Sequence, residues 1–206
     1  LVSVAFTIVS FEQLEAISSS LTRPAEFHIK IDTGMHRQGI LIEDTGRATD
    51  LIRNNTSIQV AGLCSHLGDQ DGITSEITEK QITAWNSAVE QWKKIFSTIT
   101  HIHLGATGGS SYSNKISANV LRLGIGLYGL DPTDDKRIHG LQPALQMSSV
   151  ISGTKKIRAG EKIGYSGTFE APRDMTIATV PAGYYEGVDR RLSNKGFFKI
   201  GSKFAP

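Results

Sequence analysis

Four short segments of the chain carry side chains whose types and spacing could do chemistry. Residues 30–37 (KIDTGMHR) crowd Lys30, Asp32 and Arg37 around a glycine, and the segment SHLGDQDG contains His66. Each of these two patterns also has an ordinary interpretation. An isolated KIDTG is more typical of a surface turn with a salt bridge, and a lone histidine is more often structural than catalytic.

The other two segments suit a phosphate group. Residues 105–109 (GATGG) combine small residues with the hydroxyl of Thr107, and residues 122–126 (RLGIG) add Arg122 and exposed backbone amides. Backbone N–H groups beside small residues approach an anion closely and donate to it. Because GATGG also has the composition of a flexible loop, this signal is weak alone.

The elements that would position these segments follow a repeating βα order. Strand-like runs lie at residues 2–9, 27–31, 58–63, 101–105 and 120–127, and helical stretches lie at 11–20, with Ser10 as N-cap, and about 77–96. Active sites of parallel barrels are assembled from the loops that follow the strands. We therefore predict an α/β fold, namely about the last five βα units of a TIM-type (β/α)8 barrel, with the four segments at one end of it.

The pattern of expected secondary structure changes after about residue 131. From residue 145 onward, strand-like runs follow one another with turn residues between them and little helical periodicity. The intervening DPTDDKRIHG is polar and contains a proline, as domain boundaries often do. The sequence predicts a partial barrel over residues 1–135 and the start of a mostly β C-terminal domain over residues 136–206.

Composition argues against several classes of protein. The 22 basic and 20 acidic residues nearly balance, with no basic stripe, so a nucleic-acid partner is not expected. Neither a membrane span nor a signal peptide is evident, and the single cysteine gives no sign of an oxidising compartment, so we expect a cytoplasmic protein. No metal is expected, because no His/Cys/Asp/Glu cluster has ligand spacing; His101 and His103 are interpreted as structural.

Taken in order, the segments resemble one family, the pyridoxal-phosphate-dependent alanine racemases. Five motifs carry the resemblance across nearly the whole chain: FHIKIDTGMHRQGI, GLCSHLGDQDG, RLGIGLYGLDP, GYSGTF and IATVPAGYYEGVDRRLSN. The resemblance implies an isomerase that interconverts L-alanine and D-alanine and so supplies D-alanine for peptidoglycan. It also implies a homodimer whose active sites are shared between subunits.

The resemblance assigns catalytic roles to five residues: Tyr165, Arg37, His66, Arg122 and Lys30. Tyr165, contributed by the partner subunit, would be the acid/base for the Cα proton. Tyrosine ionises only near a pH of about 10 in water, so its phenolate needs stabilisation, which Arg37 and the His66–Arg122 pair would provide. Lys30 would match a lysine that becomes carbamylated and pairs with Arg37, although an unmodified salt-bridge lysine fits the sequence equally.

The resemblance also assigns the cofactor contacts. They are Thr107, Arg122, Gly124, Ile125 and His66. Thr107 and the amides of Gly124 and Ile125 would hold the phosphate, and Arg122 would donate to the pyridine nitrogen. Because arginine stays charged, it cannot pass a proton to the ring, which restrains the ring as an electron sink and favours racemisation over transamination.

The remaining tyrosines and the departures from the family pattern concern the substrate. Tyr184 would line the opening through which substrate enters, whereas Tyr128 and Tyr185 are interpreted as packing residues. Five positions differ from the usual residues: Ala106-Thr107 in place of Asn-Ser, Ser65 in place of Thr, His36 in place of a small residue and Glu186 in place of Asp. Two alternatives follow, a racemase of this fold acting on serine or another small amino acid, and a non-catalytic PLP-binding barrel protein. The β domain with its tyrosine argues against the second.

In the family, the lysine that forms the Schiff base with the cofactor lies in the first barrel strand, upstream of the segments found here. A further segment with another tyrosine follows the last residue of this chain. We therefore expect the chain to be a fragment that lacks the N-terminal barrel strands and the C-terminal end, and to be inactive alone.

Overall fold

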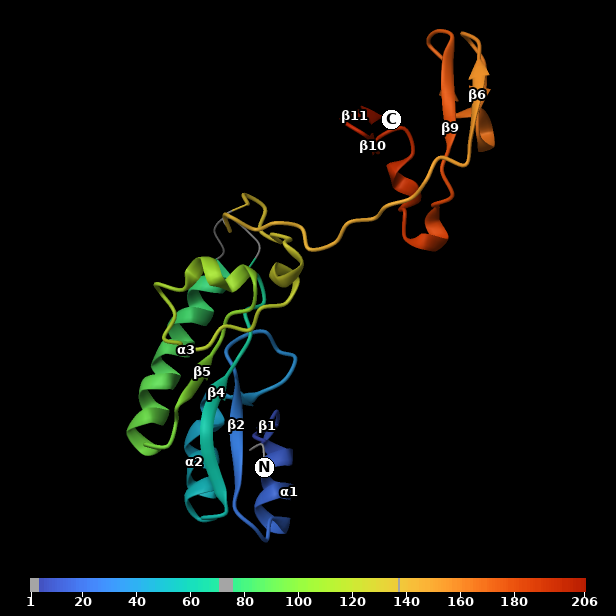
Figure 1. Ribbon diagram of the computed structural model, residues 1–206. Helices are drawn as coiled ribbons and strands as arrows, with labels where there is room; N and C mark the ends of the chain where they lie inside the picture. Colours follow the sequence, from blue (N-terminus) through green and yellow to red (C-terminus); the bar gives the residue numbers. More distant parts are fainter. Residues whose placement is uncertain (1–3, 71–75, 137) are drawn as a thin grey trace. The chain divides into compact units, whose positions relative to one another are not determined.

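The computed structural model describes residues 4–70, 76–136 and 138–206 (Figure 1). The chain divides into two compact units, Leu1–Leu145 and Gln146–Pro206. Each unit is described by itself.

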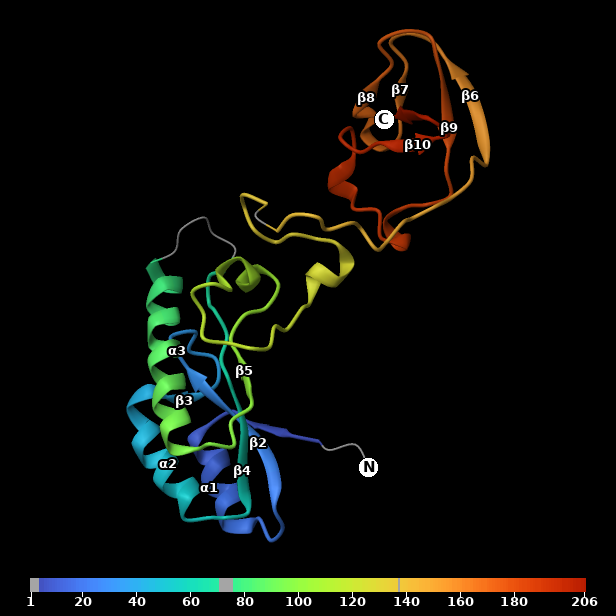
Figure 2. The same ribbon diagram turned by 60° about the vertical axis from the view of Figure 1, so that its left-hand side comes forward.

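The first unit is built on a parallel sheet. Its strands are β1 (Phe6–Ile8), β2 (Ala25–Asp32), β4 (Ile58–Cys64) and β5 (His101–His103), in the order β1-β2-β4-β5, and the short β3 (Ile40–Leu41) pairs with the end of β2. The helices α1 (Phe11–Ser20), α2 (Thr45–Arg53) and α3 (Glu76–Ile95) lie along one side of this sheet (Figure 2). Consecutive parallel strands with helices on the outer face are the arrangement of βα units in a (β/α)8 barrel.

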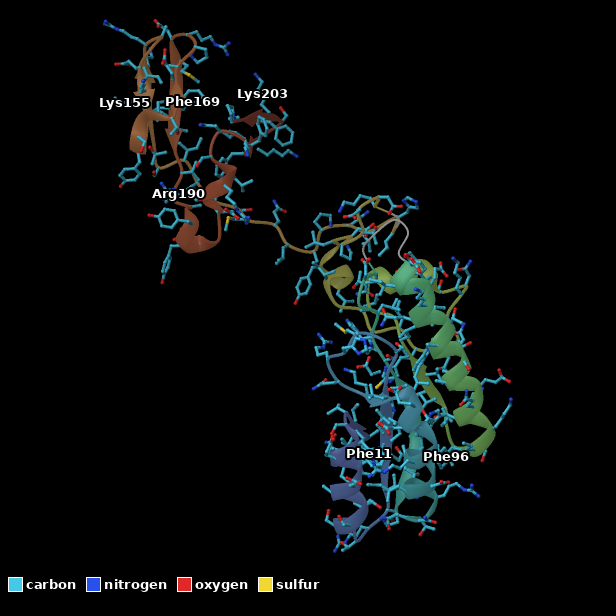
Figure 3. All side chains as sticks on the ribbon, turned by 180° about the vertical axis from the view of Figure 1, so that it is seen from behind. Phe11, Phe96, Lys155, Phe169, Arg190 and Lys203 are labelled. Carbon is cyan, nitrogen blue, oxygen red and sulfur yellow. The ribbon has the colours of Figure 1, made fainter. Side chains whose placement is uncertain are left out.

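Two features that the sequence predicts, an N-cap and an apolar face, stabilise the helices. The Ser10 hydroxyl accepts a hydrogen bond from Gln13 N at 3.2 Å and caps α1, as predicted. In α3, the predicted apolar face is buried, with Trp85 and Trp92 both at 0% exposure. Helices α1 and α2 are joined by Arg47, which donates to a Glu15 carboxylate oxygen at 2.6 Å and whose Cζ lies 3.9 Å from the centroid of the Phe11 ring. Phe11, the first residue of α1, is labelled in Figure 3.

Two parts of the first unit differ from the prediction. Helix α2 and strand β3 were not predicted; the nine residues of α2 include Gly46 and two β-branched threonines, which weaken the helical signal. The predicted strand at 120–127 is wrong. Its backbone forms no strand ladder with the described residues: Val120 N donates to Ile102 O in β5 at 3.1 Å, Arg122 N donates to Gly105 O after β5 at 3.2 Å, and the chain then turns into the 3₁₀ helix η3 (Ile125–Tyr128).

The second unit is mostly β, as predicted, and consists of antiparallel pairs. They are β6 (Gly153–Ile157) with β9 (Met175–Thr179), β7 (Lys162–Ile163) with β8 (Phe169–Glu170), and β10 (Phe198–Ile200) with β11 (Lys203–Ala205). Short 3₁₀ turns connect them, among them η4 (Tyr165–Gly167) and η5 (Tyr184–Glu186). None of the helices in the described residues has the length and apolar character that a membrane crossing needs.

Substitutions at Gly39 and Gly46 test the backbone conformation of the first unit, with Gly46 as the control. Gly39 has a φ of +135°, and a Cβ there would lie 2.4 Å from Asp32 N, whereas a Cβ on Gly46 in α2 would meet nothing within 4 Å. We expect Gly39→Ala to lower the free energy of unfolding by about 2–4 kcal/mol through strain and overlap. Gly46→Ala should raise it by up to about 1 kcal/mol by favouring the helix.

Urea unfolding followed by tryptophan fluorescence measures both effects, because Trp85 and Trp92 are the two tryptophans of the chain and both are buried in α3. Equal unfolding midpoints for the two variants would contradict the backbone conformation assigned to Gly39.

Candidate active site

The guanidinium group of Arg122 joins the C-terminal ends of β4 and β5. Its Nη1 donates to His103 O at 3.0 Å and to His103 Nδ1 at 2.5 Å. Its Nη2 donates to Ser65 O at 2.7 Å, to Leu104 O at 3.0 Å and to His66 Nδ1 at 3.2 Å. The structure therefore brings together the predicted pair of His66 and Arg122.

All five of these acceptors are uncharged, since three are main-chain carbonyls and two are imidazole nitrogens. Burial lowers the pKa of Arg122 from its ordinary value, but arginine remains charged at neutral pH. Burial and the charges of Arg122, Arg37 and Lys30 lower the pKa of His66. The site thus combines positive charge with neutral imidazoles, which favours an anionic ligand.

The protonation of His66 follows from its partner. A guanidinium group has donors and no acceptor, so His66 Nδ1 accepts the bond from Arg122 through its lone pair. The neutral ring then carries its proton on Nε2. His66 is consequently oriented as a hydrogen-bond donor at that nitrogen.

The loop after β2 is folded around Asp32. One oxygen of its buried carboxylate accepts the backbone N–H groups of Gly34, Met35 and His36, at 2.9, 3.0 and 3.1 Å. Asp32 therefore shapes the turn between Lys30 and Arg37 instead of pairing with either.

The predicted contact between Lys30 and Arg37 has no hydrogen bond in the part of the chain that the structure describes. Lys30 Nζ donates to Gln38 Oε1 at 3.2 Å instead. Two cationic side chains repel each other, so a direct pair between them would need a negative group on one of them. Both charges nevertheless contribute to lowering the pKa of His66.

Backbone donors converge at Thr107, the residue predicted to bind phosphate. The Thr107 hydroxyl is buried and accepts the N–H groups of Gly124 and Gly126, each at 3.1 Å. A Cβ on Gly126 would lie 2.7 Å from Thr107 Cγ2 and would fill this cradle. Because the Thr107 oxygen accepts both amides, its own O–H remains to donate to an anion such as a phosphate. That the amides of Gly124 and Ile125 bind the phosphate stays a prediction.

Three side chains that the sequence analysis missed hold the site loops together. Gln81 on α3 is 2% exposed; its Oε1 accepts from Gly68 N at 2.8 Å and its Nε2 donates to His66 O at 3.3 Å. Thr33 Oγ1 lies 3.0 Å from Ser65 Oγ, and Gln70 Oε1 accepts from Gly109 N at 2.9 Å. A signal existed for Gln81, because it is a polar residue on the apolar face of α3.

His103 was interpreted as a structural histidine, and the structure places it against Arg122. The alternation of β5 puts His101 and His103 on one face of the strand. In the described residues, no group of three or more His, Cys, Asp or Glu side chains is arranged to hold a metal ion.

The predicted tyrosines of the second unit are exposed within it. Tyr165 begins η4 and is 91% exposed, and Tyr184 begins η5 and is 77% exposed. The turn that carries Tyr165 has positive φ at Gly164 (73°), Ser166 (62°) and Gly167 (54°). Tyr185 is 94% exposed and Tyr128, in the first unit, 55% exposed, so neither is buried by its own unit as a packing residue would be.

Comparisons with known proteins agree with the order of the motifs. The family model for the N-terminal domain of alanine racemase matches residues 2–132, and the model for its C-terminal domain matches residues 144–206. An alanine racemase of Borreliella burgdorferi (strain ZS7) is 33% identical over 179 residues, which cover 85% of this chain and 48% of the relative.

Solved structures show the same likeness. An alanine racemase from E. faecalis has a TM-score of 0.74 at 28% identity, over 94% of this chain and 53% of that one. An alanine racemase from Bartonella henselae, solved with covalently bound pyridoxal phosphate, has a TM-score of 0.67 at 26% identity, over 93% of this chain and 52% of that one. The chain spans about half the length of the relatives it matches.

The neutral state of His103 predicts a loss of stability in acid. Burial, then Arg122, His28 and His101, lower the pKa of His103 to about 4, against about 6.5 in an unfolded chain. Between these values the unfolded chain binds more protons than the folded one, so the free energy of unfolding falls as pH falls through this window.

We expect His103→Gln to make this pH dependence shallower, because glutamine does not titrate and its amide oxygen still accepts from Arg122. Urea unfolding at several pH values between about 4 and 7 measures the slope. A slope in the variant as steep as in the parent would show that His103 is not held neutral.

Proposed function

The chain belongs to the alanine racemase family, and from this premise we propose that the protein interconverts L-alanine and D-alanine with pyridoxal 5'-phosphate as its cofactor. The observation that carries the proposal is the joining of Arg122, His66 and the Thr107 cradle at one end of the parallel sheet. Arg122 would be a cationic donor for the cofactor ring, and the Thr107 hydroxyl, fixed by two amides, would be a donor for its phosphate. The term full-length protein denotes a protein that contains this chain and has the length of the relatives that it matches.

The cofactor would be held at two ends by residues of the first unit. The Thr107 hydroxyl and the backbone amides of Gly124 and Ile125 would bind the phosphate, with the hydroxyl oriented by the N–H groups of Gly124 and Gly126 that donate to its oxygen. Arg122 would donate to the pyridine nitrogen without releasing its proton. When bound, pyridoxal phosphate supplies an electron sink that makes the Cα proton of the amino acid acidic.

Proton transfer at Cα would fall to Tyr165. The phenolate of Tyr165 would remove the proton from one face of Cα for one enantiomer, and its phenol would deliver a proton to that same face for the other enantiomer. The opposite face needs a second acid/base, a role for the Schiff-base lysine that the resemblance places upstream of this chain. His66, which carries a proton on Nε2, and the positive charge of Arg37 would stabilise the phenolate form. Because Tyr165 is 91% exposed in its own unit, we propose a homodimer in which each subunit contributes this tyrosine to the site of its partner.

Several finer assignments belong to the same proposal. Residues 1–135 would form part of the barrel, residues 136–206 the start of the C-terminal domain, and Tyr184 part of the opening for substrate. Lys30 would react as the neutral amine with carbon dioxide, lose one proton and become a carbamate that pairs with Arg37. The protein would act in the cytoplasm and supply D-alanine for peptidoglycan.

A racemase for serine or another small amino acid is the main alternative, and His36 is the departure that could support it. Its backbone has a φ of 54°, a conformation that explains why a small residue suits this position. The His36 side chain is 79% exposed, and its Nδ1 lies 3.8 Å from a carboxylate oxygen of Asp32. Alanine therefore remains the proposed substrate.

The direct test is conversion of L-alanine to D-alanine by the full-length protein with added pyridoxal phosphate. We expect turnover of L-alanine to exceed that of L-serine. Faster turnover of L-serine would support the alternative substrate, and no turnover of either, with cofactor bound, would support the non-catalytic barrel protein.

Tyr165 and Tyr185 form a matched pair for the catalytic assignment, since both are more than nine-tenths exposed, at 91% and 94%. We expect Tyr165→Phe to lower kcat by about 100-fold or more, as loss of a general acid/base does, with cofactor absorbance unchanged. Tyr185→Phe should leave kcat within about twofold of the parent. Equal effects of the two substitutions would remove Tyr165 from the mechanism.

A further inference from the structure

His103, which contacts Arg122 through Nδ1, makes a second hydrogen bond through Nε2. Its partner is His28, a residue that the proposed mechanism does not use. His28 Nδ1 on β2 lies 2.9 Å from His103 Nε2 on β5, with the ring centroids 5.1 Å apart. His101, on β5, stacks against the other side of this pair, with its centroid 5.5 Å from that of His28.

A glycine in the intervening strand makes this contact possible. Gly62 on β4 is paired in register with His28 on one side and His101 on the other. A Cβ on Gly62 would lie 2.8 Å from both Nε2 and Cδ2 of His28. The imidazole of His28 therefore reaches across β4 to β5 only because this position has no side chain.

The direction of each hydrogen bond in the chain from Arg122 to His28 is fixed by Arg122. Because a guanidinium group cannot accept, His103 Nδ1 must be the acceptor of the bond from Nη1. The neutral ring of His103 then carries its proton on Nε2 and donates it to His28 Nδ1. His28 must consequently accept, with its own proton on Nε2.

We propose that His28 is a positioning residue for Arg122: by accepting from His103 Nε2, it holds His103 in the one neutral tautomer that can accept from the guanidinium group. Without that acceptor, His103 gains access to the tautomer protonated on Nδ1, in which two donors face each other and Arg122 is displaced. The consequence for catalysis rests on the proposed function, whereas the tautomer of His103 does not.

Three variants separate hydrogen bonding from ring volume. In His28→Asn, the side-chain oxygen stands two bonds from Cβ, as Nδ1 does in histidine, so an acceptor is kept. In His28→Leu, the side chain fills space but accepts nothing. His101→Asn is the matched control, because His101 stacks on His28 while the bonds of the Arg122 chain run through His28 and His103.

Long-range ¹H–¹⁵N spectra of the histidine side chains, recorded on the full-length protein, report the tautomer directly. We expect the Nε2–H form of His103 in the parent, in His28→Asn and in His101→Asn, and a mixture of tautomers in His28→Leu. In the alanine assay, kcat of His28→Leu should fall by about threefold to tenfold, the effect of one neutral hydrogen bond. The KM for alanine should change by less than about twofold, and both other variants should keep kcat within about twofold.

Two results overturn the positioning role. One is a His28→Leu variant in which His103 keeps the single Nε2–H form. The other is a loss of kcat in His28→Asn equal to that in His28→Leu, which would show that the ring, and not its acceptor nitrogen, is what matters. Absence of alanine turnover in the parent would instead refute the proposed function, and the spectra would still decide the tautomer.

Discussion

The site end of the first unit depends on a half-buried arginine, Arg122, whose hydrogen bonds in the described part of the chain go to uncharged groups. A charged group removed from water is costly unless hydrogen bonds replace its hydration. Arg122 obtains them from three carbonyls and two imidazoles at the ends of β4 and β5. These acceptors fix its direction but do not cancel its charge. The positive charge that remains, beside Lys30 and Arg37, suits an anionic cofactor and the carboxylate of an amino acid.

The parallel sheet provides the positions from which this arrangement is built. The carboxyl ends of β2, β4 and β5 lie side by side, so the loops after them meet although they are far apart in sequence. Glycine is needed where backbones or rings approach closely, as at Gly62, which gives space to His28, and at Gly126, which gives space to Thr107. Gln81 then ties the loop of His66 to α3. Burial of α3 in the core is thereby linked to the orientation of a site residue.

Much of the fold and part of the candidate site could be predicted from the sequence, because the patterns that indicate them lie within short segments. The strands β2 and β4, the cap of α1, the apolar face of α3 and the pairing of His66 with Arg122 all followed from pattern or motif. The features that the sequence did not predict depend on contacts between residues far apart in the chain. The run at 120–127 has strand composition, but its hydrogen bonds go to β5 and to the loop after it and form no strand ladder with the described residues. His28 and His103 are ordinary strand histidines in sequence, and only the register across Gly62 and the position of Arg122 give them a role.

The most direct test of the central claim concerns the ring nitrogen of the proposed cofactor, to which Arg122 would donate. In the full-length protein loaded with pyridoxal phosphate labelled at its ring nitrogen, the ¹⁵N chemical shift distinguishes a protonated nitrogen from one that only accepts a hydrogen bond. A guanidinium group held by neutral acceptors and unable to give up its proton predicts an unprotonated, hydrogen-bonded nitrogen. A shift in the range of a protonated pyridinium would contradict the role assigned to Arg122.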